Sequence, residues 1–405
     1  MTRLKIDHKY CIRHKAAYKC AIGKALEVLA SGGILRFKDS RSKRILKFLK
    51  QKPTDSVCGY GICYVKFVSL IYKKYDVLVA SPCVIQHCVD VLDRVDRRIM
   101  HMFPCRGRLK SKEVNECEKA KKALVELFNY DRFGDGKRLV VRCDPKAGLY
   151  FAWESMPKRN WSAWHFIRAL NASTCSYCNT EGVFSLLLNS KMPGTPETVV
   201  EGGDTRRSPL DHFFGYSKYP CFGLSLFNLV PSCTRCNTNM KGARKQCLKR
   251  FIHPYLESFD DGARFYVLYE HYSSIVFPEE RDACVVVRPP TGNEDRELVN
   301  RAIESAKFFH LEEVYSQTYK REVVDIIRRI VSMPEAYWDD MKCRFPGIDG
   351  SIVNRILLGC SIDRSVINSE RLSKLACDLW EQLHVGVLPE EFVWAVNAKS
   401  LGEYP

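Results

Sequence analysis

The stretch from Leu210 to Gly242 reads LDHFFGYSKYPCFGLSLFNLVPSCTRCNTNMKG and holds most of the chemistry-bearing residues of the chain. It opens with an acidic residue next to a histidine, Asp211-His212, and it closes on a Cys-x-x-Cys pair, Cys233 and Cys236. A second pair, Cys175-x-x-Cys178, lies upstream. These three features set the expectations for the fold and for the function.

Two Cys-x-x-Cys pairs are typical of a site in which four thiolates surround one Zn²⁺ ion. A gap of two residues lets both sulfurs of a pair reach the same tetrahedral ion at about 2.3 Å. Four cysteines leave no coordination position for a substrate, so we expect this zinc to be structural. The alternative is four unrelated buried cysteines, and the spacing of both pairs argues against it.

Asp211 and His212 offer the chemistry of metal-assisted phosphodiester hydrolysis. A carboxylate holds a hard divalent cation, and an imidazole, with a pKa of about 6.5, takes a proton from water at neutral pH. Adjacent residues of a strand point to opposite faces, so we expect a bend or loop at this strand end. Asp-His pairs also arise by chance. This pair is a stronger indication of a catalytic site because it lies between the cysteine pairs and is followed by Asn228 and Asn237.

The pattern CxxC…DH…N…CxxCN…KG resembles the HNH endonuclease family, whose ββα-metal core is often clamped by a four-cysteine zinc site. The resemblance covers residues 170–266, continues in part over 267–385 and is absent from 1–110. Within the family, the chain is similar to bacterial HNH proteins associated with phage defence and mobile elements. It implies an α+β fold in which an HNH core, stapled by zinc, lies between a basic mixed N-terminal region and a helical C-terminal region.

The resemblance also implies roles for individual residues. His212 would be the general base that activates water, and Asp211 and Asn237 would hold one Mg²⁺ or Mn²⁺ ion. Asn228 would brace the loop and orient His212. The expected products carry a 5′-phosphate and a 3′-hydroxyl. Flanking phosphates would be contacted by basic residues of the second cysteine pair and the segment after it, which are Lys241, Arg235, Arg244 and Lys245.

Two departures from the family pattern concern the same segment. Gly215-Tyr216 stands where relatives tend to carry Pro-Lys, and Asn237 replaces the third histidine of the strict His-Asn-His version. His253, which precedes Pro254 and Tyr255, has two interpretations. It either helps to bind phosphate or metal, or it is a packed residue that caps a turn, and geometry rather than residue type decides between them.

Composition places the chain among ordinary globular proteins. It has 405 residues, of which 46% are hydrophobic and 27% charged, and this excludes collagen-like and disordered polymers. The most apolar stretch, 77–92, is interrupted by proline and polar residues, so we expect no membrane span. The N-terminal residues show no apolar signal segment. The 19 cysteines are therefore expected to be reduced or metal-bound, as in a cytoplasmic protein.

The net charge of +16 is unevenly distributed along the chain. Residues 1–250 carry 46 Lys and Arg against 21 Asp and Glu, whereas residues 251–405 carry 17 against 26. A positive half predicts a polyanionic partner, of which nucleic acid is the commonest, although solubility alone is the alternative. The charge and the motifs divide the chain into a basic region of unassigned fold (1–150), an HNH nuclease domain (151–266) and a mainly helical region (267–405).

Hydrophobic periodicity gives a coarse secondary structure. The segment 59–79 fits either buried strands or a core helix, and 180–209, rich in Gly, Pro, Thr and Ser, is expected to be a surface insertion. Helices are expected over 15–31, 42–51, 112–130, 160–171, 297–309, 311–333, 351–359 and 369–383, and strands over 138–143, 263–272 and 283–288.

Together these expectations describe a metal-dependent DNA endonuclease. By resemblance it would act in the bacterial cytoplasm, in phage defence or a mobile element, with an ATPase or another defence-system protein as a partner. One alternative is a zinc-dependent nucleic-acid-binding protein without cleavage activity. Another is a subunit of a defence complex that is active only with its partner.

Overall fold

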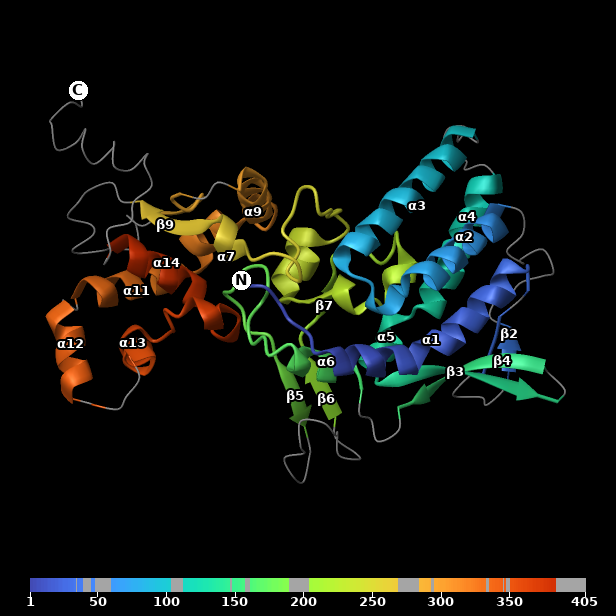
Figure 1. Cartoon of the computed structure of the whole chain (residues 1–405), viewed down its shortest axis with the longest axis horizontal. Coiled ribbons are helices and arrows are strands. Elements are labelled where there is room, and N and C mark those ends of the chain that lie inside the picture. The colour runs from blue at the N-terminus through green and yellow to red at the C-terminus, as the bar shows by residue number, and fades with distance from the viewer. Residues whose placement is uncertain are drawn as a thin grey trace.

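The computed structural model describes residues 1–33, 35–38, 45–47, 60–102, 112–145, 148–156, 161–188, 204–268, 284–292, 295–332, 335–344, 346 and 350–383. Over these residues the protein is mixed α+β, mostly helical with small sheets, which confirms the expected fold class at this level (Figure 1). None of the described helices combines the length and the apolar character needed to cross a membrane.

The N-terminal part is a group of long helices above a four-stranded sheet (Figure 1). Helix α1 buries a stripe at helical spacing that includes Tyr18, Ile22 and Leu26, and it packs on α2 and on β3. The sheet has the order β2-β1-β4-β3. The elements are α1 (His8–Ala30), β1 (Arg36–Lys38), β2 (Ile45–Lys47), α2 (Tyr60–Tyr75), α3 (Pro82–Met102), α4 (Lys112–Leu127), β3 (Lys137–Asp144) and β4 (Gly148–Ser155).

Two sequence expectations in this part are decided by the structure. The segment 59–79, left open between strands and a helix, is helical where it is described: α2 covers Tyr60–Tyr75, and a 3-10 turn, η2, covers Val77–Val79. The helix expected over 42–51 is wrong where the chain is described, because Ile45–Lys47 is strand β2 and pairs antiparallel with β1 through Phe37↔Leu46. That pairing supplies backbone partners from a distant segment, which helical periodicity cannot register. The rest of 42–51 lies outside the described residues.

The middle of the chain forms short elements around one antiparallel pair of strands. β7 (Leu210–His212) pairs with β8 (Leu229–Pro231) in the register Asp211↔Val230, and the π-helix η6 (Arg235–Lys241) follows β8. The expected insertion over 180–209 contains two strands that pair antiparallel, β5 and β6, and its residues 189–203 lie outside the described part. The remaining elements are α5 (Tyr130–Gly134), α6 (Ala163–Ala169), β5 (Ser185–Leu188), β6 (Asp204–Arg207), η4 (Pro220–Phe222) and η5 (Leu226–Asn228).

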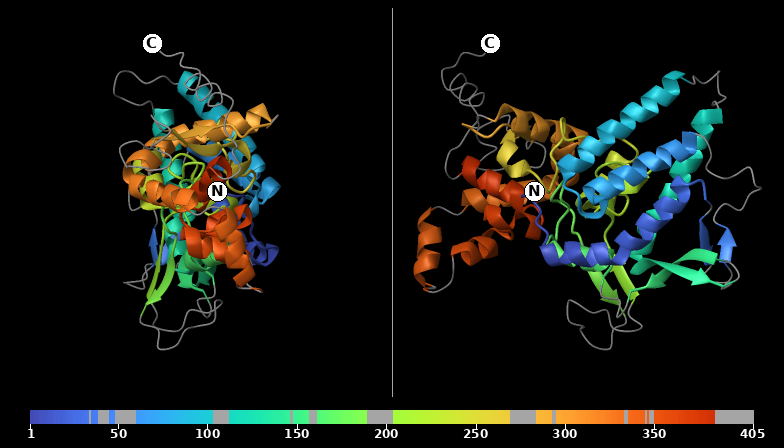
Figure 2. Two further views of the ribbon diagram at one scale, coloured as in Figure 1. Left: turned by 90° about the vertical axis from the view of Figure 1, so that its left-hand side faces the viewer. Right: turned by 45° about the vertical axis from the view of Figure 1, so that its right-hand side comes forward.

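The C-terminal part contains an antiparallel pair of strands, β9 and β10, with helices packed against it (Figure 2). The expected helix 311–333 is interrupted, because Val314–Thr318 forms a π turn and a regular helix resumes at Lys320. The elements are α7 (Phe259–Gly262), β9 (Arg264–Leu268), β10 (Cys284–Arg288), α9 (Arg296–Phe308), α10 (Leu311–Glu313), η8 (Val314–Thr318), α11 (Lys320–Ser332), α12 (Glu335–Arg344), α13 (Gly350–Leu358), η9 (Arg364–Ser369) and α14 (Ser373–Leu383).

The three expected regions are joined more closely than their boundaries suggest. The boundary between residues 150 and 151 falls inside β4, which pairs with β3 on both sides of it. The first residues of the chain reach the centre of the molecule (Figure 1), where the Leu4 amide donates to Pro254 O at 2.7 Å. Thr2 exchanges two hydrogen bonds with the side chain of Asn368. One hydrophobic core therefore runs through all three regions.

Candidate metal centre and adjoining pocket

The four cysteines of the two Cys-x-x-Cys pairs meet in one buried cluster. The Sγ atoms of Cys175, Cys178, Cys233 and Cys236 lie within 4.8 Å of one another, and those of Cys178 and Cys233 are 3.9 Å apart. Sulfurs bound to a tetrahedral ion at about 2.3 Å are about 3.8 Å apart. The donor set and its spacing therefore fit one structural metal ion such as Zn²⁺.

Elements distant in sequence hold the first cysteine pair in place. Asn179 has a left-handed backbone (φ 56°), which turns the chain directly after Cys178. Its side-chain amide donates to Ile367 O at 2.8 Å and to Glu370 O at 3.0 Å, and it accepts from the Lys374 amide at 3.0 Å. The start of the C-terminal helix α14 is thus tied to the metal cluster.

Arg235 belongs to this cluster rather than to a phosphate-facing surface. Its guanidinium donates to Cys178 Sγ at 3.7 Å and to Thr180 Oγ1, and it lies 5.3 Å from the centre of the Tyr319 ring. A positive charge beside a four-thiolate metal site offsets part of the site's negative charge. Arg235 was expected to contact a phosphate; it lies instead against the first cysteine pair, because it stands between Cys233 and Cys236, whose sulfurs belong to the same cluster.

A pocket of about 410 Å³ opens next to β7 and the π-helix η6. Asp211 and His212 reach it from β7, and Asn237 reaches it from η6. Three residues singled out in the sequence are therefore brought to one site by the β7–β8 pair and the helix after it. The pocket wall also carries the basic residues Lys218, Lys241, Arg244 and Lys245.

The imidazole of His212 is fixed by a backbone carbonyl and two aromatic rings. Its Nε2 lies 3.0 Å from Gly223 O, Tyr216 stacks on the ring, and Tyr130 packs edge-on. Burial is the main cause that lowers the pKa of His212 to about 4, so the ring is neutral at pH 7. A neutral ring that donates from Nε2 has its lone pair at Nδ1, which has no hydrogen-bond partner among the described residues.

Asn228 acts on the loop that follows β7. It is fully buried, its Oδ1 accepts from the Phe214 amide at 2.7 Å, and its Nδ2 donates to Phe214 O and Phe222 O. Phe222 precedes Gly223, whose carbonyl holds His212. The expected bracing of the loop is thus present, whereas the hydrogen bonds of the Asn228 amide go to Phe214 and Phe222 and not to His212 itself.

Asp211 is buried in a dense set of hydrogen bonds. Its two oxygens accept from Lys241 Nζ at 2.8 and 2.7 Å, and its Oδ2 also accepts from the Tyr177 hydroxyl at 2.6 Å. The same ammonium donates to His212 O and to Phe213 O. Lys241, expected to contact a flanking phosphate, instead forms a buried ion pair with Asp211. The fold brings the end of η6 next to β7, and the spacing of residues along the sequence does not indicate this proximity.

Whether Asp211 and Asn237 fit Mg²⁺ depends on the lone pairs that remain. A carboxylate has about four acceptor sites, of which Lys241 takes two and Tyr177 one. Mg²⁺ keeps several waters and needs only one or two protein carboxylates. One acceptor site of the Asp211 carboxylate remains. The pocket lining also offers the side-chain oxygens of Asn237 and of Asp131. By residue type, these side chains match the oxygen ligands that Mg²⁺ prefers.

The three remaining expected site residues, His253, Arg244 and Lys245, do not share one environment. His253 is fully buried beside Phe213, and desolvation lowers its pKa to about 3. Its carbonyl accepts from the amides of residues 256 and 257, so it is the packed turn residue of the two interpretations. Arg244 lies over the ring of Phe308 and donates to its carbonyl at 2.9 Å, whereas Lys245 is exposed at the pocket rim.

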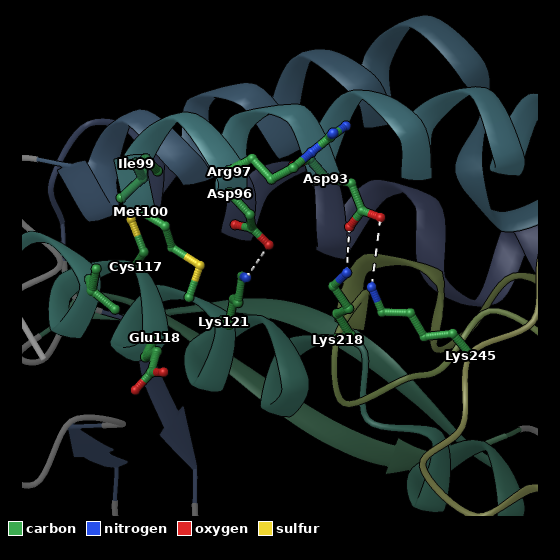
Figure 3. A pocket seen from close by; sticks show the side chains of 11 residues that line it. Asp93, Asp96, Arg97, Ile99, Met100, Cys117, Glu118, Lys121, Lys218 and Lys245 are labelled. Carbon is green, nitrogen blue, oxygen red and sulfur yellow. Dashed lines mark hydrogen bonds and ion pairs between the residues drawn. The ribbon is translucent and has the colours of Figure 1, made fainter. Parts of the chain in front are cut away.

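Several residues at the site carry no sequence signal. Tyr177, inside the first cysteine pair, and Asp131, from α5, reach the site only through the tertiary fold. A second hollow of about 310 Å³ lies between α3 and α4 and shares Lys218 and Lys245 with the pocket (Figure 3). Neither helix carries a motif that would have indicated it.

Comparison with protein-family models, with curated proteins and with solved structures gave no match to this chain. Its function is therefore inferred from the residues of the cluster and the pocket.

Proposed function

We propose that this chain is a metal-dependent endonuclease of the HNH type that hydrolyses phosphodiester bonds of DNA. The observation that carries the proposal is the meeting of His212, Asp211 and Asn237 on one pocket wall. The histidine has an unpartnered Nδ1, and the two other side chains offer oxygen donors beside it. A site of this composition is suited to activating a water molecule against a phosphodiester.

His212 accepts the proton of the attacking water at Nδ1. The carbonyl of Gly223 fixes the ring through Nε2, so the base is oriented before the substrate arrives. Protonation at Nδ1 leaves the Nε2 contact intact, because Nε2 donates in both forms. Asn228 keeps this carbonyl in position by holding the loop.

Asp211 and Asn237 would hold Mg²⁺ or Mn²⁺, which supplies a Lewis acid for the scissile phosphate and for the leaving oxygen. Lys241 fixes the Asp211 carboxylate against the β7 backbone, so its remaining oxygen lone pair has a set direction. Lys245 and Lys218 at the rim are the cations placed to contact the DNA backbone. Zn²⁺ at the four cysteines would hold β8 and η6 to the first cysteine pair.

The proposal is tested by incubating the purified full chain with supercoiled plasmid in Mg²⁺, in Mn²⁺ and in EDTA. Nicked or linear plasmid is expected with either cation and not with EDTA. Zinc content is measured after each incubation, so that loss of the structural ion is not mistaken for loss of the catalytic one. Retained DNA binding without cleavage in both cations would contradict the proposal.

A second candidate is a zinc-dependent nucleic-acid-binding protein, or a defence-complex subunit, that does not cleave alone. The observation in its favour is the Lys241 ammonium on Asp211, which already gives that carboxylate a counter-ion. Cleavage that begins only when a partner protein is added would support the subunit. Binding without cleavage under every condition would support the binding protein.

A further inference from the structure

The hollow between α3 and α4 opens beside the candidate cleavage pocket. The two cavities share two lining residues, Lys218 and Lys245, so they are neighbours along one surface. Figure 3 shows Lys218 and Lys245 pointing toward Asp93 of α3 from the opposite side of the hollow. A polynucleotide whose scissile phosphate lies in the pocket must continue past its rim, and this hollow is a continuation that the described residues offer.

The lining of the hollow carries four basic side chains (Arg97, Lys121, Lys218 and Lys245) and three carboxylates (Asp93, Asp96 and Glu118), so the basic side chains are in excess by one. Lys218 Nζ and the Tyr219 hydroxyl donate to Asp93 Oδ1, and Lys121 pairs with Asp96 at 2.6 Å. Lys245 is exposed and lies 3.9 Å from Asp93, which is a weak contact. Arg97 donates only to the backbone carbonyl of Asp93 and pairs with no carboxylate among the described residues.

One end of the hollow, away from Lys218 and Lys245, is apolar (Figure 3). It is formed by Ile99 and Met100 of α3 and by Val114 and Cys117 of α4. A surface with cations at one end and an apolar patch at the other is complementary to the backbone of a DNA strand, in which anionic phosphates alternate with sugars.

We propose that this hollow binds the DNA strand next to the scissile phosphate. Lys218 and Lys245 contact the phosphate at the junction of the two cavities, and Arg97 contacts the next one. In the free protein the Asp93 carboxylate is the counter-ion of both lysines, and it competes with the phosphate for them. The proposal rests on the proposed function for the identity of the ligand. It assigns to the helices of the N-terminal region a definite part in substrate binding.

Matched pairs of basic residues test the proposal. Arg97 lines the hollow, and its neighbour Arg98 is exposed on the same helix without lining it; Lys245 and Lys249 form a second such pair. The affinity of each full-length variant for a short fluorescein-labelled DNA duplex is measured by anisotropy over a range of NaCl concentrations, without Mg²⁺. Arg97→Ala and Lys245→Ala should each weaken binding about fivefold or more, and the slope of log K against log salt should fall by about 0.9 per lost phosphate contact.

The controls Arg98→Ala and Lys249→Ala should each change the affinity less than about twofold, with the salt slope unchanged. Asp93→Asn provides a test of opposite sign. Removing a carboxylate beside a phosphate should tighten binding, whereas a purely structural role for Asp93 would weaken it. Circular dichroism of each variant confirms that it is folded before its affinity is compared.

Equal affinities and salt slopes for Arg97→Ala and Arg98→Ala, and for the two lysine variants, would overturn the proposal. If the wild type cleaves plasmid while these pairs behave alike, the inference fails and the proposed function stands. If the pairs differ as expected but no cleavage occurs, the hollow is a nucleic-acid site and the proposed nuclease activity fails.

Discussion

At the scale of single residues, the ion pair between Lys241 and Asp211 is the feature with the clearest energetic consequence. Both side chains are buried, and Lys241 is 3% exposed. Removing one partner of such a pair leaves the other charge buried without compensation. Lys241→Met should therefore lower the free energy of unfolding by about 3 to 5 kcal/mol, measured by urea denaturation.

The matched control is Lys245→Met, which removes the same charge from an exposed position of the same segment. It should change stability by less than about 1 kcal/mol. The double variant Lys241→Met with Asp211→Asn should recover part of the loss, because no charge then remains unpaired. Equal, small effects of both lysine variants would show that the Lys241–Asp211 pair does not form.

Residues that belong to a sequence motif could be predicted, whereas residues that reach the site only through tertiary contacts could not. The cysteine spacing predicted a four-sulfur cluster, and the order of Asp211, His212 and Asn237 anticipated a shared pocket. Lys241 and Arg235 were expected on phosphates, because a basic residue without a visible counter-ion is assigned to solvent or ligand. Their actual partners lie about 30 and 57 residues away in the chain, beyond the range of any local pattern.

At the scale of elements, the metal cluster links the first cysteine pair to the C-terminal helix α14. Asn179 follows Cys178 and contacts Ile367, Glu370 and the Lys374 amide, so removal of the metal ion frees the turn that these contacts require. Chelation of zinc should therefore raise hydrogen exchange in 364–383 and in 233–242.

Helix α1, whose buried face lies outside the cluster, is the internal reference and should keep its protection. Cys178→Ser should give the same pattern without a chelator, and it controls for metal bound elsewhere. A uniform rise of exchange over the whole chain, or no change in 364–383, would contradict the link between the metal and α14.

The helices of this chain were easier to predict than its strands. Helices with an apolar stripe, such as α4 and α9, carry their own signal in a period of 3.6 residues. Helix α3 was missed because it begins at Pro82 within a stretch assessed for membrane character, although proline suits the first turn of a helix. Strand β2 was missed because three residues have no period, and its partner β1 alone makes it a strand.

At the scale of the whole molecule, buried neutral histidines tie stability to pH. His14 accepts a hydrogen bond at Nδ1 from Trp161 and contacts Leu224 O through Nε2, so its neutral form is satisfied. Burial lowers the pKa of His14 and of His165 to about 4 and that of His253 to about 3. All three values lie below the unfolded value of about 6.5.

The direction in which the free energy of unfolding changes with pH follows from these lowered pKa values. Below about pH 6.5 the unfolded chain binds protons that the folded chain excludes, so the free energy of unfolding is highest above that pH and falls toward pH 4. Each histidine contributes up to about 1.4 kcal/mol per pH unit in this window. The slope is measured by urea denaturation at several pH values, and His14→Gln should reduce it. Stability that is constant between pH 6.5 and 4.5 would contradict the neutral burial of these rings.

The whole-molecule arrangement was the part least open to sequence reasoning. Charge and motif changes suggested three regions, yet β4 crosses the first boundary, and residues 1–4 pack against the segments around Pro254 and Asn368. Composition records an average over a segment, whereas a core is built from side chains that meet across segments. The candidate pocket is also built from more than one of the expected regions, because Asp131 of α5, in the N-terminal region, lines it.

The proposed hydrolysis depends most directly on His212 as the base. The rate of cleavage of a labelled DNA duplex by excess enzyme in Mg²⁺ is to be compared for wild type, His212→Ala and His310→Ala, an exposed histidine outside the pocket. We expect His212→Ala to lose about a hundredfold or more in rate while DNA affinity and zinc content stay unchanged, and His310→Ala to match the wild type. Cleavage by His212→Ala at the wild-type rate would contradict the account.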